Sequence, residues 1–522
     1  MKGAIAAGHP LTAEAGAAIL REGGNAVDAC IGAAFVSWVT ESPLTGPGGG
    51  GFMLVYRARD RAATLHDFFV SLPGAGLEGG TRARMEDIDV DFDGSTHQIF
   101  HVGAASAAVP GKPLGLESVH RRYASLPWKT LIEPAIELAR SGVELTRAQA
   151  YLHAILDLIL RHTDESRAIY GPAGERLVAG DRLVMSDLAT SLETLRDKGA
   201  QELYTGELGR LIAADQAERG GAITADDLAA YRVIHRRPIG ADFRGQRFLS
   251  NPPPSSGGVL IAYGLRLLDR LALGGPSGSA DAISTLAEVM REQGRARGGS
   301  FATDLYRGGL VARLCSDAAV EAALERIGAG APTVREAPAA HGTTHISVVD
   351  ARGNAASLTA STGAGSGVVV PGTGIQLNNM LGEYDLNPPG REGRPGTRMT
   401  SMMAPSLVLD GERPRLVVGS AGSLRLRGAI MQIVVNAAGR GQGVEEAIRS
   451  PRVHLDEDHL HCEGGTDPAA LDELERRGYD VVRWRRPNLY FGGAAAVELL
   501  EDGTLAAAGD PRRGGHGVVV AA

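Results

Sequence analysis

A threonine that directly follows a glycine, at the start of a strand-like segment, is the feature of this sequence best suited to chemistry. Residues 344–350, which follow Thr343, have the period of two that is typical of a β-strand. A threonine hydroxyl is a weak nucleophile unless a base lies beside it, and one solution uses the residue's own α-amine, whose pKa is about 7.7–8.0. That amine becomes free only if the bond between Gly342 and Thr343 is cut, and glycine can turn its carbonyl toward the following hydroxyl. The segment is compatible with a self-cleaving threonine hydrolase, although taken alone it favours a plain edge hairpin with a structural threonine.

The residues after this strand predict a partner strand that places a second hydroxyl beside the first. Residues 350–354, Asp-Ala-Arg-Gly-Asn, are typical of a three-residue hairpin loop with Gly353 in the left-handed region, and residues 355–361 form the returning strand. If Asp350 pairs with Asn354, then Thr343 faces Ser361. A slip of one residue would break this pairing, so the hypothesis depends on the register.

A glycine-containing turn between a strand and a helix is a second candidate for chemistry. Residues 416–418 predict the strand, residues 419–423 the turn and residues 424–438 the helix. Backbone N–H groups at such a turn point at one spot and could form an oxyanion hole. A tight turn needed only for packing explains the same pattern equally well.

The composition indicates a globular protein that does not bind nucleic acid. The chain has 522 residues, of which 43% are hydrophobic and 22% charged, and a net charge of −8 with scattered basic residues. Its three cysteines have neither the spacing of a disulfide framework nor that of a metal site. The glycine run at 46–51 is not followed by the Lys-Ser/Thr of a phosphate-binding loop. We therefore expect no nucleic-acid partner, no metal and no cofactor.

The apolar segments do not predict a membrane protein. The first residues lack an apolar signal core, and the longest apolar stretch, at 29–39, is shorter than the ~20 residues that a membrane span needs. We expect no membrane association and a cytoplasmic protein, or a periplasmic or secreted one if a signal peptide was left out.

Periodicity and turn residues predict the elements that must position these groups. Helices are expected at 13–21, 25–39, 131–140, 148–161, 187–195, 280–295 and 424–438, and strands at 52–56, 344–350, 355–361, 406–409 and 415–418. A rigid loop is expected at 251–258 and an exposed linker at 332–342.

Several motifs together resemble the γ-glutamyltranspeptidase family of N-terminal-nucleophile hydrolases, in the order that the family has them. They are Glu22-Gly23-Gly24-Asn25-Ala26-Val27-Asp28-Ala29, Gly48-Gly49-Gly50-Gly51-Phe52, Val109-Pro110-Gly111, Pro253-Pro254-Ser255-Ser256-Gly257-Gly258, Thr343-Thr344-His345-Ile346-Ser347-Val348-Val349-Asp350, Gly374-Ile375-Gln376-Leu377-Asn378-Asn379 and Asp510-Pro511-Arg512-Arg513.

The resemblance implies an α+β fold, a four-layer αββα sandwich, made as one precursor that cleaves itself before Thr343. It implies a large subunit, 1–342, with a helical portion, and a small subunit, 343–522, joined as a heterodimer; a dimer of heterodimers is compatible with it. Thr343 would be the nucleophile and Ser361 the hydroxyl that contacts it. By resemblance, Gly422 and Ser423 match the oxyanion-hole pair, and Ser401 matches a serine near the substrate carboxylate.

The sequence departs from the family where the substrate binds. Phe69 stands where the family has an arginine that holds the substrate carboxylate, and Phe cannot supply the two parallel hydrogen bonds of a guanidinium. Met380 and Glu383 replace the family's Gln and Asp after Asn379, and Met402 replaces a second serine. The candidates for substrate binding are Glu383, Ser401, Asn379 and Phe69.

Three hypotheses remain open. The first is a threonine hydrolase that cleaves γ-glutamyl or related small-molecule amides, with hydrolysis favoured over transfer. The second is an acylase of the same fold that acts on glutaryl- or β-lactam-type amides. The third is an unprocessed relative that binds without catalysis.

Overall fold

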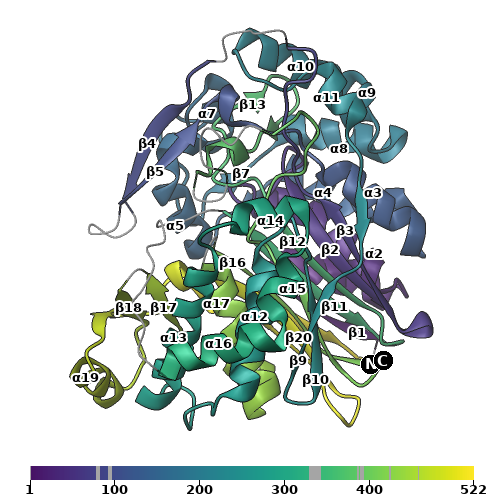
Figure 1. Ribbon diagram of the computed structural model, residues 1–522. Helices are drawn as coiled ribbons and strands as arrows, with labels where there is room; N and C mark the ends of the chain where they lie inside the picture. Colours follow the sequence, from purple (N-terminus) through teal and green to yellow (C-terminus); the bar gives the residue numbers. More distant parts are fainter. Residues whose placement is uncertain are drawn as a thin grey trace.

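Two β-sheets lie face to face at the centre of the molecule (Figure 1). The computed structural model describes residues 2–77, 83–91, 97–328, 342–384, 387, 393–422, 425–456 and 458–521. The first sheet runs in the order β22 (His516–Val520), β1 (Gly3–Ala7), β11 (Thr344–Asp350), β12 (Ala355–Ser361), β2 (Gly50–Arg57), β3 (Ala62–Phe68) and β8 (Ile234–Arg236). The second runs in the order β21 (Leu505–Gly509), β20 (Gly493–Leu499), β16 (Arg413–Ala421), β15 (Ser406–Asp410), β10 (Gln246–Ser250) and β9 (Ile239–Phe243).

Helices cover the outer face of each sheet. The first sheet is covered by α1 (Pro10–Arg21) and α2 (Ala26–Thr40), with α4 (Trp128–Ser141) packed on α2 and α8 (Ser186–Lys198) on α4. The second is covered by α12 (Gly257–Arg270) and α17 (Arg425–Val434), with α13 (Ala280–Ala296) packed on α12. Because successive strand residues face opposite sides, Met53 and Val55 of β2 pack toward the first group of helices, while Phe52 and Leu54 pack toward the second sheet. This order of layers confirms the predicted α+β, four-layer αββα sandwich.

Strands from the two ends of the chain are interleaved in the first sheet. β11 pairs on one side with β1 and on the other with β12, and β12 in turn pairs with β2. β22 pairs with the far side of β1, so the two ends of the chain lie together (Figure 1). Any cut before β11 would therefore divide one continuous hydrogen-bonded sheet between two chains.

Most predicted elements are confirmed, with four differences. The loop expected at 251–258 ends at Ser256, because α12 begins at Gly257. The helix expected at 148–161 is interrupted at Leu156 and forms α5 (Arg147–Ile155) and α6 (Asp157–Leu160). The helix expected at 424–438 is α17 followed by a π-helical turn (Val435–Gly439), and residues 423–424 lie outside the described residues. Within the expected exposed linker, residues 332–341 lie outside the described residues, and Gly342 is buried because it packs against the hairpin.

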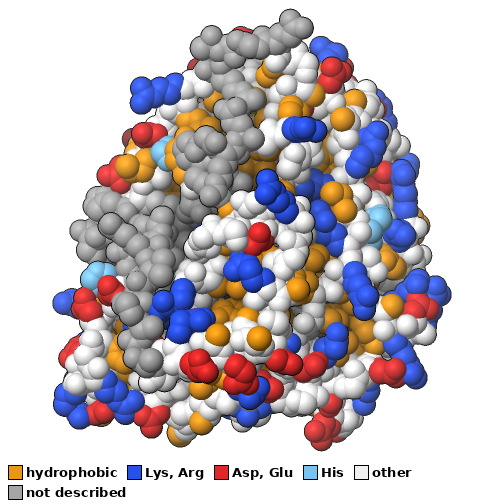
Figure 2. Space-filling model, viewed as in Figure 1, with side chains coloured by type: hydrophobic (Ala, Val, Ile, Leu, Met, Phe, Trp, Pro, Cys, Tyr) orange, Lys and Arg blue, Asp and Glu red, His pale blue; other side chains and the backbone are white. Residues whose placement is uncertain are grey.

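Charged side chains of both signs share the described surface. On the face in Figure 2, basic and acidic groups lie beside one another. Among the helices of the described residues, none has the length and apolarity needed to cross a bilayer.

Candidate active site at the start of strand β11

The hairpin of β11 and β12 positions the candidate nucleophile in the predicted register. Thr344 lies opposite Ala360 and Val349 opposite Ala355, so one further step brings Thr343 opposite Ser361. The loop is closed by an N–H of Asp350 that donates to the carbonyl of Asn354 at 3.0 Å. Gly353 has a φ of 78°, the left-handed conformation expected at this position.

The Ser361 hydroxyl contacts the residue before the candidate nucleophile. Its Oγ donates a hydrogen bond to the carbonyl oxygen of Gly342 and accepts one from the N–H of Gly363 at 2.8 Å. Thr343 and Ser361 are both buried, so this contact is shielded from water. A donor on this carbonyl would draw electron density away from its carbon, the atom that the Thr343 hydroxyl would attack.

Gly342 lies where a larger residue would not fit. A Cβ at this position would be 2.5 Å from the carbonyl oxygen of Gly363 and 3.0 Å from the side chain of Leu44. Real Cβ atoms essentially never approach neighbours that closely, so the chain packs tightly at the predicted cleavage site.

Two predicted substrate residues, Asn379 and Glu383, border the same loop. Asn379 Oδ1 accepts from the N–H of Ala364 at 2.9 Å, and its Nδ2 donates to the carbonyl of His101 at 3.3 Å. A Cβ on Gly363 would meet both Asn379 Oδ1 and, at 2.9 Å, Glu383 Oε1. The structure thus places both side chains against the loop that packs on Gly342.

Arg513 lies between the candidate nucleophile and the glycine turn. Its Nη1 donates to the carbonyl oxygen of Thr343 at 3.2 Å, and its side chain packs on Gly493. Gly493 pairs with Ala421, and Gly422 follows with a φ of 123°. One of the two predicted oxyanion residues is therefore near Thr343, while the other, Ser423, lies outside the described residues.

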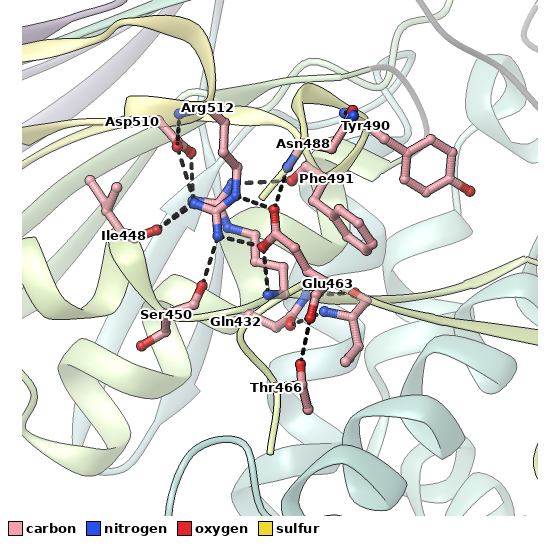
Figure 3. Close-up of polar contacts among 12 residues, drawn as sticks. Gln432, Ile448, Ser450, Glu463, Thr466, Asn488, Tyr490, Phe491, Asp510 and Arg512 are labelled. Carbon is pink, nitrogen blue, oxygen red and sulfur yellow. Dashed lines mark hydrogen bonds and ion pairs between the residues drawn. The ribbon is translucent and has the colours of Figure 1, made fainter. Parts of the chain in front are cut away.

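A buried network of charges holds the segment that carries Arg513. Figure 3 shows the Arg512 guanidinium between Asp510 and Glu463, with ion-pair distances of 3.1 and 2.5 Å. The Asp510 carboxylate also pairs with Arg452 at 2.7 Å. Two cations and two anions, all almost completely buried, balance one another here. The Asp-Pro-Arg-Arg motif thereby fixes the backbone next to Arg513.

The other two predicted substrate residues are buried elsewhere in the core. The Phe69 ring stacks on Phe52 with a centroid distance of 5.4 Å and is 1% exposed. Ser401 Oγ accepts from the N–H of Met403 at 3.1 Å. In the described part of the chain, neither side chain forms a hydrogen bond with Thr343.

Sequence reasoning missed two buried charges beside the hairpin. Glu41 Oε2 accepts from the Thr344 hydroxyl at 2.5 Å, and burial raises the pKa of this carboxyl to about 7. Lys112 is fully buried with its Nζ on Thr45 Oγ1, and burial holds the pKa of its amine well below the usual value. A charged residue at the end of an otherwise apolar run, as at Glu41, was a signal that could have been used.

His345, two residues after the candidate nucleophile, is hydrogen-bonded to neighbouring side chains within the sheet. Its ring nitrogens lie 2.8 Å from Thr359 Oγ1 and 2.9 Å from Ser347 Oγ. Burial lowers the pKa of this imidazole to about 3, so it is neutral at pH 7. The other histidine considered, His341, lies outside the described residues.

Comparisons with known proteins agree with this architecture. The sequence model of the family described as Gamma-glutamyltranspeptidase matches residues 12–520. The glutathione hydrolase proenzyme of Escherichia coli (strain K12) is 32% identical, with 98% of this chain and 90% of the relative covered. The acylase ACY 1 proenzyme of Pseudomonas sp. (strain SE83) is 34% identical over 99% of this chain and 94% of that protein.

A solved structure has the same fold as this chain. The crystal structure of cephalosporin acylase from Bacillus halodurans matches with a TM-score of 0.86 and 25% identity, over 99% of this chain and 95% of that one. The resemblance noted from the sequence motifs is confirmed, as is the prediction of a γ-glutamyltransferase-like hydrolase. The chain belongs to the γ-glutamyltranspeptidase family.

Proposed function

We propose that this chain is a precursor that cuts itself between Gly342 and Thr343 and then hydrolyses γ-glutamyl or related small-molecule amides with Thr343. The observation that carries the proposal is the hydrogen bond from the Ser361 hydroxyl to the Gly342 carbonyl, next to a buried threonine. The names of the relatives, a glutathione hydrolase proenzyme and an acylase proenzyme, support it.

Self-cleavage needs only groups of this chain and water. The Thr343 Oγ attacks the Gly342 carbonyl carbon, a C–O bond forms, and the C–N bond to Thr343 breaks as its nitrogen takes up the proton from Oγ. The Ser361 hydroxyl stabilises the negative charge on the carbonyl oxygen. Water then hydrolyses the ester, which leaves a carboxylate on Gly342 and a free α-amine on Thr343.

The freed amine would then act as the base for substrate turnover. It takes the proton from the Thr343 hydroxyl, which attacks the substrate amide to form an acyl-enzyme, and it returns the proton to the leaving nitrogen. Backbone N–H groups of Gly422 and Ser423 are the candidates for stabilising the oxyanion. The subunits 1–342 and 343–522 would stay together as a heterodimer, because β11 and β12 remain paired with β1 and β2.

The acylase alternative is favoured by one specific observation. Phe69 stands at the family's arginine position, and its ring is buried against Phe52, so this position supplies no positive charge for a substrate carboxylate. The match to a cephalosporin acylase is compatible with this reading. A substrate panel of glutathione, γ-glutamyl anilides and acyl anilides would separate the two candidates by their kcat/KM values.

Intact mass after purification tests the proposal before any substrate is chosen. We expect two chains, the smaller beginning at Thr343, and a single chain of 522 residues for Thr343→Ala. Thr343→Ser keeps a hydroxyl and should still be cut, which makes it the matched control. A parent chain that remains whole would favour the non-catalytic binding alternative.

A further inference from the structure

A buried carboxyl group lies directly behind the proposed nucleophile. Glu41, just after α2, accepts a hydrogen bond from Thr344 Oγ1 on one oxygen, at 2.5 Å, and from Thr12 Oγ1 on the other, at 3.2 Å. It is 4% exposed. A Cβ on Gly8 would overlap a Glu41 carboxylate oxygen, so the carboxyl is held firmly against the backbone, one residue away from Thr343.

Cations from two other elements act on this carboxyl. Lys112 belongs to α3 (Lys112–Tyr123), and its amine is buried beside Thr45. Arg513 belongs to η6 (Pro511–Arg513) and donates to the carbonyl of Thr343. Both side chains favour the ionised form of Glu41, and burial opposes it.

Three further titratable side chains lie near this cluster. His9, which precedes α1, is buried with its pKa lowered to about 4, so it carries no charge at pH 7. Glu383 lies beside Gly363, in the loop that packs on Gly342. Arg425, at the start of α17, acts on Arg513 rather than on Glu41.

We propose that Glu41 is a positioning residue which is held in place by its contact with Thr344 and whose charge sets the protonation of the α-amine that Thr343 gains on cleavage. This inference rests on the function proposed above and deepens it. The amine must accept a proton from the hydroxyl and then donate it to the leaving nitrogen, so both of its forms must be accessible near neutral pH. Arg513 and burial favour the neutral amine, and the carboxylate of Glu41 favours the ammonium.

Two groups that interact by about one pKa unit or more titrate as a coupled pair, and these two also titrate in the same pH range. The Glu41 carboxyl has its pKa raised to about 7, and a free α-amine titrates at about 7.7–8.0. A carboxylate roughly 6–8 Å from an ammonium, in a medium with an effective dielectric constant of about 20–40, raises the pKa of the ammonium by about 1–2 units. Removing the negative charge should lower the pKa of the amine by that amount.

Glu41→Gln is the test, because the amide oxygen can still accept from Thr344 while the charge is lost. The measurement is kcat/KM against pH, on the anilide that the parent enzyme turns over best. We expect Glu41→Gln to be cleaved as the parent is, with the acidic limb of its profile about 1–2 pH units lower. Glu41→Asp keeps the charge and should keep the limb near its parental position.

Each other outcome has a definite meaning. A cleaved, active Glu41→Gln enzyme with an unmoved acidic limb refutes this inference alone, and so does a folded Glu41→Gln chain that stays uncut. If that variant does not fold, Gly8→Ala displaces the same carboxylate sterically and should move the limb in the same direction; an unmoved limb there also refutes the inference. A parent chain that never cleaves refutes the proposed function itself.

Discussion

The hydroxyl of Ser361 gives the most direct test of the proposed self-cleavage. Ser361→Ala removes the hydrogen bond to the Gly342 carbonyl and leaves Thr343 and the bond to be cut unchanged. As Thr343 attacks, negative charge gathers on that carbonyl oxygen, so the hydrogen bond is stronger in the transition state than in the precursor. The effect of the substitution should therefore appear in the rate of cleavage.

The size of the effect follows from the chemistry of oxyanion stabilisation. Loss of one preorganised donor to a developing oxyanion costs about 2.7–4 kcal/mol, or a factor of roughly 10²–10³ in rate. The same change leaves the buried N–H of Gly363 without its acceptor, which costs about 1–3 kcal/mol of stability. The two effects are separable, because the first is a rate of chain cleavage and the second is a fall in Tm.

Intact mass and denaturing gels, sampled from cell lysis onward, follow the disappearance of the 522-residue chain. The parent should be cut at the first sample, and Ser361→Ala should persist as one chain and convert roughly 10²–10³-fold more slowly. Ser361→Thr keeps a donor and should be cut within about tenfold of the parental rate. Complete cleavage of Ser361→Ala at the first sample, or equal slowing by both variants, would refute the assigned role of the hydroxyl.

Two further predictions concern stability. Glu463→Gln removes one charge of a buried ion pair with Arg512 and should lower the free energy of unfolding by about 3–5 kcal/mol, measured as a lower Tm. Glu445→Gln, in an exposed pair, should lower it by at most about 1 kcal/mol. Similar losses in the two variants would contradict the burial argument. The pKa of His345 is lowered from 6.5 to about 3 in the folded state, so its stabilising contribution is full above pH 6.5 and is lost as pH falls, by about 2 kcal/mol at pH 5. Urea titrations at pH 7 and pH 5 should show this loss in the parent and less of it in His345→Gln; an equal loss in both would exclude His345 as its source.

The local part of the site could be predicted from the sequence, because local rules determine it. The loop at 350–354 fixes the register of β11 and β12, and Gly353 adopts the left-handed conformation that the loop type requires. That register brings Ser361 to the level of Thr343 without any knowledge of the rest of the fold. The order of layers, in contrast, came from the family resemblance, since periodicity alone does not show which sheet a strand joins.

The parts that sequence reasoning missed are contacts between distant segments. Glu41 and Thr344 are 303 residues apart, and Arg513 and Thr343 are 170 apart. No pattern of hydrophobic spacing joins such pairs, because they depend on how the two sheets and their helices pack. The Ser361 hydroxyl donates to the carbonyl oxygen of Gly342 and not to the Thr343 side chain. This depends on the rotamer of Ser361, which the strand register does not determine.

The interleaved sheet explains how the proposed cleavage before Thr343 would leave the fold intact. β11 is hydrogen-bonded along both edges, to β1 and to β12, before any bond is cut. Separating residues 343–522 from residues 1–342 would break the pairings of β11 with β1 and of β12 with β2, and would expose the apolar faces of Ile346 and Val348, which are fully buried. The free energy that holds the subunits together is therefore already present in the precursor, and the cut changes only the groups at its two new ends. For this reason the neighbours of Thr343 in the uncut chain, including the carboxyl behind it, are the groups that its new amine would meet.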